Sequence, residues 1–155
     1  PNSLVYIDQV GSNNNIYVYQ DDSDSKRAMY VNSGDNNLIS IVQQGTGNHV
    51  AGISNTPNTT VSNSNNSSNN IAVTQQGSGN HSASVLFTDP VTNSNNSVTI
   101  LQSGGVGANK SFNLQLQGSG IGVNVTQNNA TTPDAASMSI QCLTPPCTGY
   151  SYTRH

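Results

Sequence analysis

A repeated spacing of amide and glycine residues constrains the fold of this 155-residue chain more than any other feature. The first copy fits S-x5-Q-x-G-x-x-N-x5-Q from Ser3 to Gln20 without a gap. The segments QQGTGNH (43–49) and QQGSGNH (75–81) are nearly identical. Because internal repeats of about 20–50 residues are typical of stacked architectures, the chain is expected to fold as a series of similar units. Later copies begin at Asn37, Asn69 and Asn96, and a degenerate copy begins at Lys26.

The residues between the repeated amides predict β-strands. Apolar residues alternate with polar ones at a period of two, and most of the apolar residues are β-branched. The G-x-G-N and G-x-x-N segments between them are typical of turns, since Gly and Asn tolerate positive φ. We expect strands at 3–9, 14–20, 26–32, 37–43, 48–54, 69–75, 80–87, 96–102, 109–117, 121–127, 135–141 and 148–154, with a weak strand at 59–63.

Two strands per repeat predict an all-β solenoid. Its turns would start near residues 3, 26, 48, 69, 96 and 121. This spacing suits a two-strands-per-turn β-solenoid of about six to seven rungs, able to stack further into a cross-β fibre. We assign residues 1–141 to the solenoid and residues 142–155 to a disulfide-closed turn plus a C-terminal strand that completes or joins it.

Stacking would satisfy the polar side chains of such a fold. A buried amide without a partner costs about 1–3 kcal/mol, whereas in a stacked array each amide donates to one neighbouring rung and accepts from the other. The predicted stacking ladder comprises Ser3, Gln9, Gly11, Asn14, Gln20, Asn37, Gln43, Gly45, Asn48, Asn69, Gln75, Gly77, Asn80, Asn96, Gln102, Gly104, Asn109 and Gln127. The predicted apolar core comprises Val5, Ile7, Ile16, Val18, Ile39, Ile41, Ile71, Val73, Val98, Ile100, Val123 and Val125.

The composition argues against several classes of function. The chain holds 24 Asn, 22 Ser, 14 Thr and 11 Gln, and charged residues make up only 7%. Its four cations are scattered, so we expect no nucleic-acid partner. No apolar run approaches the roughly 20 residues that span a bilayer, so we expect no membrane insertion. The Asp and His residues form no metal-spaced cluster or catalytic motif, so we expect neither an enzyme nor a cofactor.

Two residue pairs allow more than one interpretation. Cys142 and Cys147 enclose a short LTPP segment, and we favour a disulfide that shapes the corner before the last strand over two free thiols. His49 and His81 occupy the same place in the repeat, directly after the turn Asn. We interpret them as solvated turn residues, with a metal-binding or pH-switching ladder as the alternative.

Some segments depart from the pattern. Residues 55–68 and 88–96 are longer connections, which we expect to loop out at one edge of the stack. Lys26 stands where the repeat has a small inward residue. The apolar residues of 110–117 fall one step out of phase with Asn109, and the extra residues of GGVGA (104–108) leave the register of that strand open to a shift by one residue.

The repeat unit resembles the curlin repeat, the building block of curli fibres on bacterial surfaces. The resemblance covers most of residues 1–127 and is clearest in 1–54 and 69–109. It implies a secreted β-solenoid subunit that polymerises into an extracellular, cell-surface functional amyloid for biofilm matrix and adhesion. It also implies a nucleator subunit and an outer-membrane secretion pore as partners.

The two ends of the predicted solenoid favour a homopolymer. Soluble repeat proteins blunt their terminal rungs with charges or a helix, and neither 3–9 nor 148–154 carries such a cap. We expect head-to-tail association, with 148–154 completing the half-rung of a neighbouring molecule. Leu4, Tyr6, Tyr150 and Tyr152 are the predicted residues of this polymer joint.

Other functions on the same fold remain open as alternatives. The first is a β-helical component of a phage or virion fibre, or a surface adhesin that does not polymerise. An ice-binding solenoid would need aligned T-x-T ranks, and a polysaccharide-acting enzyme would need converging carboxylates. The sequence offers neither pattern.

Overall fold

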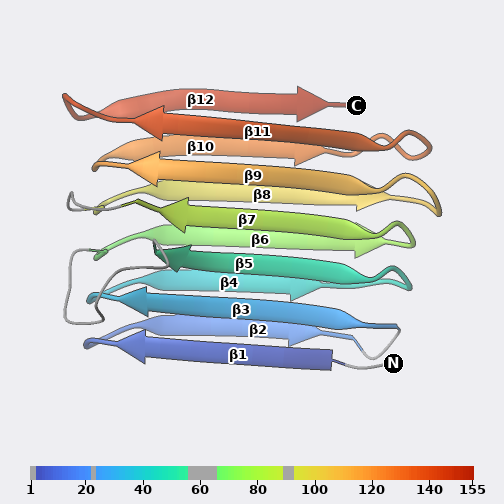
Figure 1. The fold of residues 1–155 in the computed structure, drawn as a ribbon, viewed down its shortest axis with the longest axis horizontal. Helices are drawn as coiled ribbons and strands as arrows, with labels where there is room; N and C mark the ends of the chain where they lie inside the picture. The colour runs from blue at the N-terminus through green and yellow to red at the C-terminus, as the bar shows by residue number, and fades with distance from the viewer. Residues whose placement is uncertain (1–2, 22–23, 56–65, 89–92) are drawn as a thin grey trace.

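The computed structural model describes residues 3–21, 24–55, 66–88 and 93–155. In these residues twelve strands form two parallel six-stranded sheets, and no helix is present. The chain alternates between the sheets, so that successive turns lie on one another (Figure 1). The predicted all-β solenoid with two strands per turn is therefore confirmed. Five turns separate the first and last strand of a sheet, slightly fewer than predicted.

The strand boundaries lie within two residues of the predicted ones, and 59–63 falls outside the described residues. The first sheet, called sheet A here, holds β1 (Ser3–Val10), β3 (Lys26–Ser33), β5 (His49–Asn55), β7 (His81–Phe87), β9 (Lys110–Gln117) and β11 (Asp134–Gln141). The second, sheet B, holds β2 (Asn15–Gln20), β4 (Leu38–Gln43), β6 (Asn70–Gly77), β8 (Ser97–Gly104), β10 (Ile121–Gln127) and β12 (Cys147–Arg154).

The core lies between the two sheets as vertical columns of apolar side chains. In sheet B, Ile39, Ile71, Val98 and Val123 stand one above another in the strand register, and all four are buried. Burying one such side chain contributes about 1.5–3 kcal/mol. Buried side chains from outside the predicted core set complete the interior, and these include Tyr30, Phe87, Phe112, Leu114 and Leu116.

The first rung departs from the predicted core. Val5 is 45% exposed and Ile7 is 47% exposed, although both align with inward residues of β3. Ile16 and Val18 in β2 are only partly buried. The core prediction is therefore wrong for Val5 and Ile7 in the single chain, because no described strand lies below the first rung to cover them. Ile16 and Val18 still pack against the core from its edge.

The register of β9, which the sequence left open, is not shifted relative to β7. β7 and β9 pair without interruption from His81 opposite Lys110 to Phe87 opposite Leu116. The extra residues are accommodated in the preceding turn, where the Ala108 N–H donates to the Gly105 carbonyl. The register is fixed by the core, because a one-residue slip would turn the apolar residues of β9 outward.

The corners repeat as regularly as the strands. In the corners that lead into β2, β4, β6 and β8, the residue two positions before the strand has a left-handed backbone. Its φ is 56° to 59° at Asn13, Asn36, Ser68 and Asn95. At the opposite corner, a Cβ on Gly45 would lie 2.5 Å from the Gly77 carbonyl oxygen, so only glycine fits there. These short turns hold successive rungs one strand spacing apart.

The C-terminal segment closes the last rung of its own chain. Cys142 and Cys147 form a disulfide that spans the turn before β12 and ends on its first residue, and Cys142 is buried. β12 then pairs with β10, with a register shift between Ile121 and Val123. The expectation that 148–154 completes a half-rung of a neighbour is therefore wrong in that form, because the last rung of its own chain contains this strand. Within the described strands β12 pairs through one edge with β10, and its other edge is unpaired, like the outer edges of β1, β2 and β11.

Candidate functional site

Five glutamines form a continuous hydrogen-bonded column through the solenoid, which we call the glutamine ladder. They lie at or near the ends of the strands of sheet B from β2 to β10. In the first four of them, Nε2 donates to the Oε1 of the next glutamine towards the C-terminal end, at 2.8 to 2.9 Å. Because every bond runs the same way, the column has a direction. Its members are Gln20, Gln43, Gln75, Gln102 and Gln127.

The second N–H of each amide joins the two sheets. In every rung the glutamine Nε2 also donates to a backbone carbonyl of sheet A, at 2.7 to 3.1 Å. Because a carbonyl oxygen can only accept, the NH₂ group of the amide must face the carbonyl of sheet A. In every glutamine above Gln20, the Oε1 atom then faces the rung below and accepts a hydrogen bond from it. The amide orientation is thus fixed by the backbone. The accepting carbonyls are those of Leu4, Arg27, Val50, Ser82 and Ser111.

Gln9 and Gly11 do not belong to the columns in which the sequence placed them. Gln9 lies in sheet A, opposite Asn32, and its Nε2 donates to the Gly34 carbonyl. A Cβ on Gly11 would meet Gly34, while Gly45, Gly77 and Gly104 stack at the other corner. The grouping of Gln9 and Gly11 with the later copies is therefore wrong. In the second rung the strands of both sheets end near an amide residue that is followed by a glycine-containing turn. The motif therefore does not show by itself which of the two strands of the first repeat aligns with the later copies.

A second amide column occupies the corner that leads into sheet B. Asn14 Oδ1 accepts from both the N–H and the Nδ2 of Asn37, at 3.0 Å each. Asn37 and Asn69 repeat the backbone contact with the rung that follows each of them, and Asn96 Oδ1 accepts from Ile121 N–H. These side chains satisfy backbone donors that the turn would otherwise leave without partners. Asn14 thus stacks with the Asn residues that start the sheet B repeats.

Asn48, Asn80 and Asn109 form a separate, exposed column at the opposite corner. The Oδ1 atoms of Asn80 and Asn109 accept from the backbone N–H of Asn48 and Asn80. Their side chains lie outside, because the inward set of sheet A starts one residue later, at Lys26, His49 and their equivalents. The predicted grouping with Asn14 is corrected accordingly.

Four basic side chains stack inside the solenoid, and we call them the cationic column. Lys26, His49, His81 and Lys110 are consecutive in the register of sheet A, with Ser3 below and Asp134 above. His49 is 0% and His81 1% exposed, and their rings stack with centroids 5.0 Å apart. The interpretation of the histidines as solvated turn residues is wrong. In each rung the residue after the turn Asn points inward, and the rungs above and below cover it, so the histidine rings do not reach solvent.

The lysines at the ends of this column are held by backbone carbonyls. Lys26 Nζ donates to Gly47 O at 2.8 Å and lies 3.5 Å from the Asp21 carboxylate. Lys110 Nζ donates to Asn129 O at 2.8 Å and also to Thr132 O. Buried ammonium groups are tolerated only with such partners.

The two histidines differ in their hydrogen bonds. His81 Nε2 lies 2.8 Å from Gln76 O, and Nδ1 accepts from Lys110 N–H, which places the ring proton on Nε2. Neither ring nitrogen of His49 has a hydrogen-bond partner among the described residues. His49 is therefore the least satisfied group of the column.

Burial and like charges keep the column's histidines neutral. Desolvation, followed by the positive charges of His81 and Lys26, lowers the pKa of His49 to about 4. The carbonyls of Gly77 and Gly79 oppose this shift in part, without reaching hydrogen-bonding geometry. Burial also lowers the pKa of His81 and of Lys110. Among the described residues no three His, Cys or Asp side chains gather to hold a metal ion.

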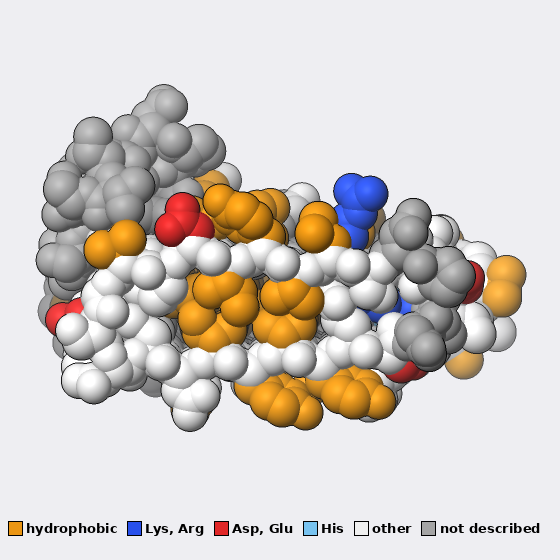
Figure 2. All heavy atoms as spheres, turned by 90° about the horizontal axis from the view of Figure 1, so that it is seen from below, with side chains coloured by type: hydrophobic (Ala, Val, Ile, Leu, Met, Phe, Trp, Pro, Cys, Tyr) orange, Lys and Arg blue, Asp and Glu red, His pale blue; other side chains and the backbone are white. Residues whose placement is uncertain are grey.

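At the N-terminal end no described strand lies below β1 and β2. Figure 2 shows apolar side chains between the backbones of the two lowest strands, where the core ends without a cover. Val5 and Ile7 are the inward residues of β1, whereas Leu4 and Tyr6 point to the outer face of sheet A, beside Met29. The assignment of Leu4 and Tyr6 to the end surface is corrected, because side chains alternate along a strand.

The C-terminal end carries more polar groups. Tyr152 packs on Phe112, with ring centroids 5.5 Å apart, and its hydroxyl donates to the Asp134 carboxylate at 2.9 Å. Tyr150 lies on the same side of β12 and is exposed, while Arg154 aligns with Gln127. Both predicted joint tyrosines thus belong to the inner face at this end, and neither β11 nor β12 has a described strand above it.

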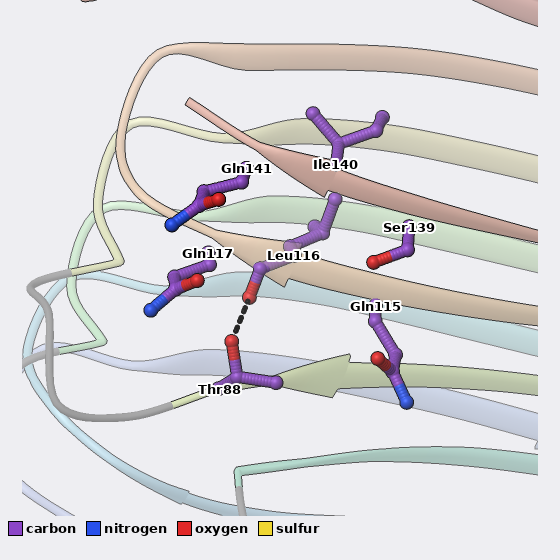
Figure 3. Close-up of a pocket in the computed structure, with 7 residues that line it drawn as sticks. All are labelled: Thr88, Gln115, Leu116, Gln117, Ser139, Ile140 and Gln141. Carbon is purple, nitrogen blue, oxygen red and sulfur yellow. Dashed lines mark hydrogen bonds between the residues drawn. The ribbon is translucent and has the colours of Figure 1, made fainter. Parts of the chain in front are cut away.

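A shallow polar pocket lies on sheet A near the ends of its last strands. Gln115 and Gln117 of β9 and Ser139 and Gln141 of β11 line it together with Thr88 (Figure 3). The Thr88 hydroxyl donates to the Leu116 carbonyl at 3.3 Å. The pocket offers neutral amides and hydroxyls but no acid, base or nucleophile arranged for catalysis among these lining residues.

Comparison with protein families, with curated proteins and with solved structures finds no match to this chain. No helix long and apolar enough to cross a membrane occurs in the described part of the chain.

Proposed function

We propose that this chain is a secreted structural subunit that polymerises head to tail into extracellular, amyloid-like fibres of the curli type. The observation that carries the proposal is the pair of open ends. At the N-terminal end β1 and β2 are edge strands, with the core residues Val5 and Ile7 exposed between them. At the other end β11 and β12 are edge strands as well.

Edge strands of this kind favour association. Each presents a row of backbone N–H and C=O groups one strand spacing from where a further strand would bind. A second copy would continue both sheets at once and cover the exposed core. Because the two ends differ, the contact is heterologous and does not close, and such a contact gives a filament.

The cysteines and the resemblance support the location and the role. The disulfide between Cys142 and Cys147 is typical of proteins in oxidising compartments. The resemblance to the curlin repeat suggests biofilm matrix and surface adhesion, with a nucleator subunit and a secretion pore as partners. The core of similar stacked rungs is the arrangement that fibre growth would extend.

The test compares two charge insertions at equal exposure. Ile7→Lys places a cation in the open end, and Met29→Lys places one on the outer face of sheet A, where Met29 is 49% exposed against 47% for Ile7. We expect wild type and Met29→Lys to form fibres with a meridional reflection near ~4.8 Å, while Ile7→Lys stays soluble. Electron microscopy and thioflavin fluorescence report the outcome.

A wild-type protein that remains monomeric or trimeric under these conditions would reject the proposal and support the alternative of a virion fibre component or a non-polymerising adhesin. Equal fibre formation by both variants would reject the open end as the growing surface.

A further inference from the structure

We propose that the joint between subunits is unipolar and continues the glutamine ladder, with Arg154 of one copy donating to Gln20 Oε1 of the next. This inference rests on the proposed function and specifies the register and direction of its interface. The partner is a second copy of this chain, placed so that β1 lies on β11 and β2 lies on β12.

The ladder ends in an acceptor at one end of the molecule. Each glutamine above Gln20 accepts through Oε1 from the glutamine of the rung below it, and each one from Gln20 to Gln102 donates through Nε2 to the glutamine of the rung above. Gln20 is the lowest member, and no donor among the described residues reaches its Oε1. The N-terminal end therefore presents a half-buried amide oxygen that is fixed in position, because Gln20 Nε2 is bound to Leu4 O and Gln43 Oε1.

The same column ends in a donor at the other end of the molecule. Arg154 takes the place above Gln127 in the register of β10 and β12. A guanidinium group has five N–H donors and no acceptor, so it can only continue the direction in which the ladder already runs. It is exposed, and no side-chain acceptor for it lies among the described residues.

The remaining inward positions fit the same register. Continuing the columns of sheet A brings Ala136 against Val5 and Met138 against Ile7 of the next copy. Continuing those of sheet B brings Tyr152 against Val18. These partly exposed apolar residues would cover one another, as their equivalents do between rungs within the chain.

One further inward contact of the proposed joint is polar and pairs a hydrogen-bond donor with an acceptor. Asp134 ends the cationic column at the C-terminal end, and Ser3 begins it at the N-terminal end. In the proposed joint the Ser3 hydroxyl is placed to donate to the Asp134 carboxylate. The carboxylate already accepts from Gln127 Nε2 and Tyr152, and it has lone pairs for a further donor.

The opposite arrangements fail on the same column. In this column two N-terminal ends offer only Gln20 acceptors to each other, and two C-terminal ends offer only Arg154 guanidinium donors. Neither pair continues the ladder, and the second adds repulsion between like charges. Both would also make the strands of the joint antiparallel, unlike every strand pair that the structure describes within the chain.

The test is a charge swap across the joint, measured as the rate at which seeds of each protein elongate with monomer of the same protein. Arg154→Glu and Gln20→Lys each remove the donor–acceptor match, and we expect each to slow elongation of its own fibres by about tenfold or more, as for a lost hydrogen bond to a charged group. The double variant places a carboxylate at position 154 of one copy against an ammonium group at position 20 of the next. Because this pair restores an attractive contact with its polarity reversed, we expect elongation within about threefold of wild type.

Matched controls carry the same charge changes away from the column. Arg27 is exposed on the outer face of sheet A, and Gln44 is exposed in a turn. We expect Arg27→Glu, Gln44→Lys and their double variant to elongate at the wild-type rate. Arg154→Ala, which removes only an exposed side chain, is the variant least able to disturb folding, and it should also slow growth.

The outcomes separate the two proposals. Wild-type protein that forms no fibres overturns the proposed function. Wild-type fibres whose growth is indifferent to Arg154→Ala and Arg154→Glu, or single variants that the charge swap does not rescue, overturn the joint while leaving the fibre function in place. Thermal unfolding of each variant as a monomer confirms that it is folded before elongation is measured.

Discussion

Two polar columns run through the interior of the solenoid, and they solve the problem of burial differently. The glutamine ladder repeats one residue in five rungs, and every Nε2 makes two hydrogen bonds. The cationic column changes from Lys26 to His49 and back to a lysine, and it contains an imidazole with no hydrogen-bond partner among the described residues. Repetition makes an uncharged amide its own best neighbour, whereas stacked basic side chains repel one another once they are protonated.

The difference has a physical origin in the side chains. An amide carries both donors and acceptors, so identical copies one strand spacing apart satisfy each other. A lysine carries donors only, and it must find backbone carbonyls such as Gly47 O or Asn129 O in the turns. We expect the ladder to supply stability at every pH and the cationic column to make that stability depend on pH.

The largest effect is expected from breaking the ladder in its middle. Gln75→Leu keeps much of the volume but removes the Gln75 partner of a Gln43 N–H, of Gln102 Oε1 and of the Val50 carbonyl. Each orphaned group costs about 1–3 kcal/mol, so we expect the free energy of unfolding to fall by about 4 kcal/mol. Chemical denaturation of monomeric protein measures the change.

Gln76→Leu is the matched control, since its side chain is exposed and adjacent in the sequence. We expect it to change the free energy of unfolding by about 0.5 kcal/mol or less. Similar losses for Gln75→Leu and Gln76→Leu would show that the ladder does not stabilise the fold.

The second effect tests the cationic column through acid. In the folded state the pKa of His49 is about 4, against 6.5 for the ordinary group, so between these values the unfolded chain binds the proton more strongly. Stability is thus fully present above pH 6.5 and is lost as the pH falls towards 4. At about 1.36 kcal/mol per unit, the loss from His49 reaches about 3 kcal/mol. Denaturation at a series of pH values measures it.

The groups that face His49 are His81, Lys26 and, beyond His81, Lys110. Protonation of His81, whose pKa is also lowered, acts in the same direction. We expect a His49→Asn variant to lose much of the acid sensitivity and an exposed His155→Asn control to keep it. Identical pH profiles for wild type and His49→Asn would contradict the assignment.

The smallest effect separates charge from burial. Lys26→Met removes one of the positive charges that lower the pKa of His49 while burial, the larger cause, remains. We expect the pKa of His49 to rise by less than about one unit, which reduces the acid loss by less than about 1.4 kcal/mol. Titration of the His49 ring by NMR measures the shift, with Arg27→Met as an exposed control. An unchanged or lower pKa would argue against a direct effect of Lys26.

The strands and the fold could be predicted from the sequence because alternation acts locally and is repeated in almost every turn. Ile39, Ile71 and Val98 share a column, as their shared place in the repeat required. The C-terminal turn and β12 were also placed within a residue of their observed bounds, although the repeat is weakest there.

The sequence could not decide which arc of a rung each motif occupies. Gln9 and Gln20 both stand six residues after a small polar residue, yet only Gln20 joins the ladder. An expected strand at 59–63 would have put His49 and His81 on opposite sides, whereas β5 and β7 are neighbours and their rings stack. The column that a residue joins depends on how many strands separate one copy of the repeat from the next. A connection that could be either a loop or a strand, such as 59–63, leaves that number undecided in the sequence.

The in-register contact of like residues bears on how such a gene can change in length. A duplicated rung from the segment that holds His49 and His81 would again place a histidine next to a histidine in the column. Unequal recombination in this segment would therefore preserve the contacts between rungs. Copying the turn that holds Lys26 or Lys110 would set two ammonium groups about 4.8 Å apart in the interior. The lysines thus mark the places where the array tolerates growth least.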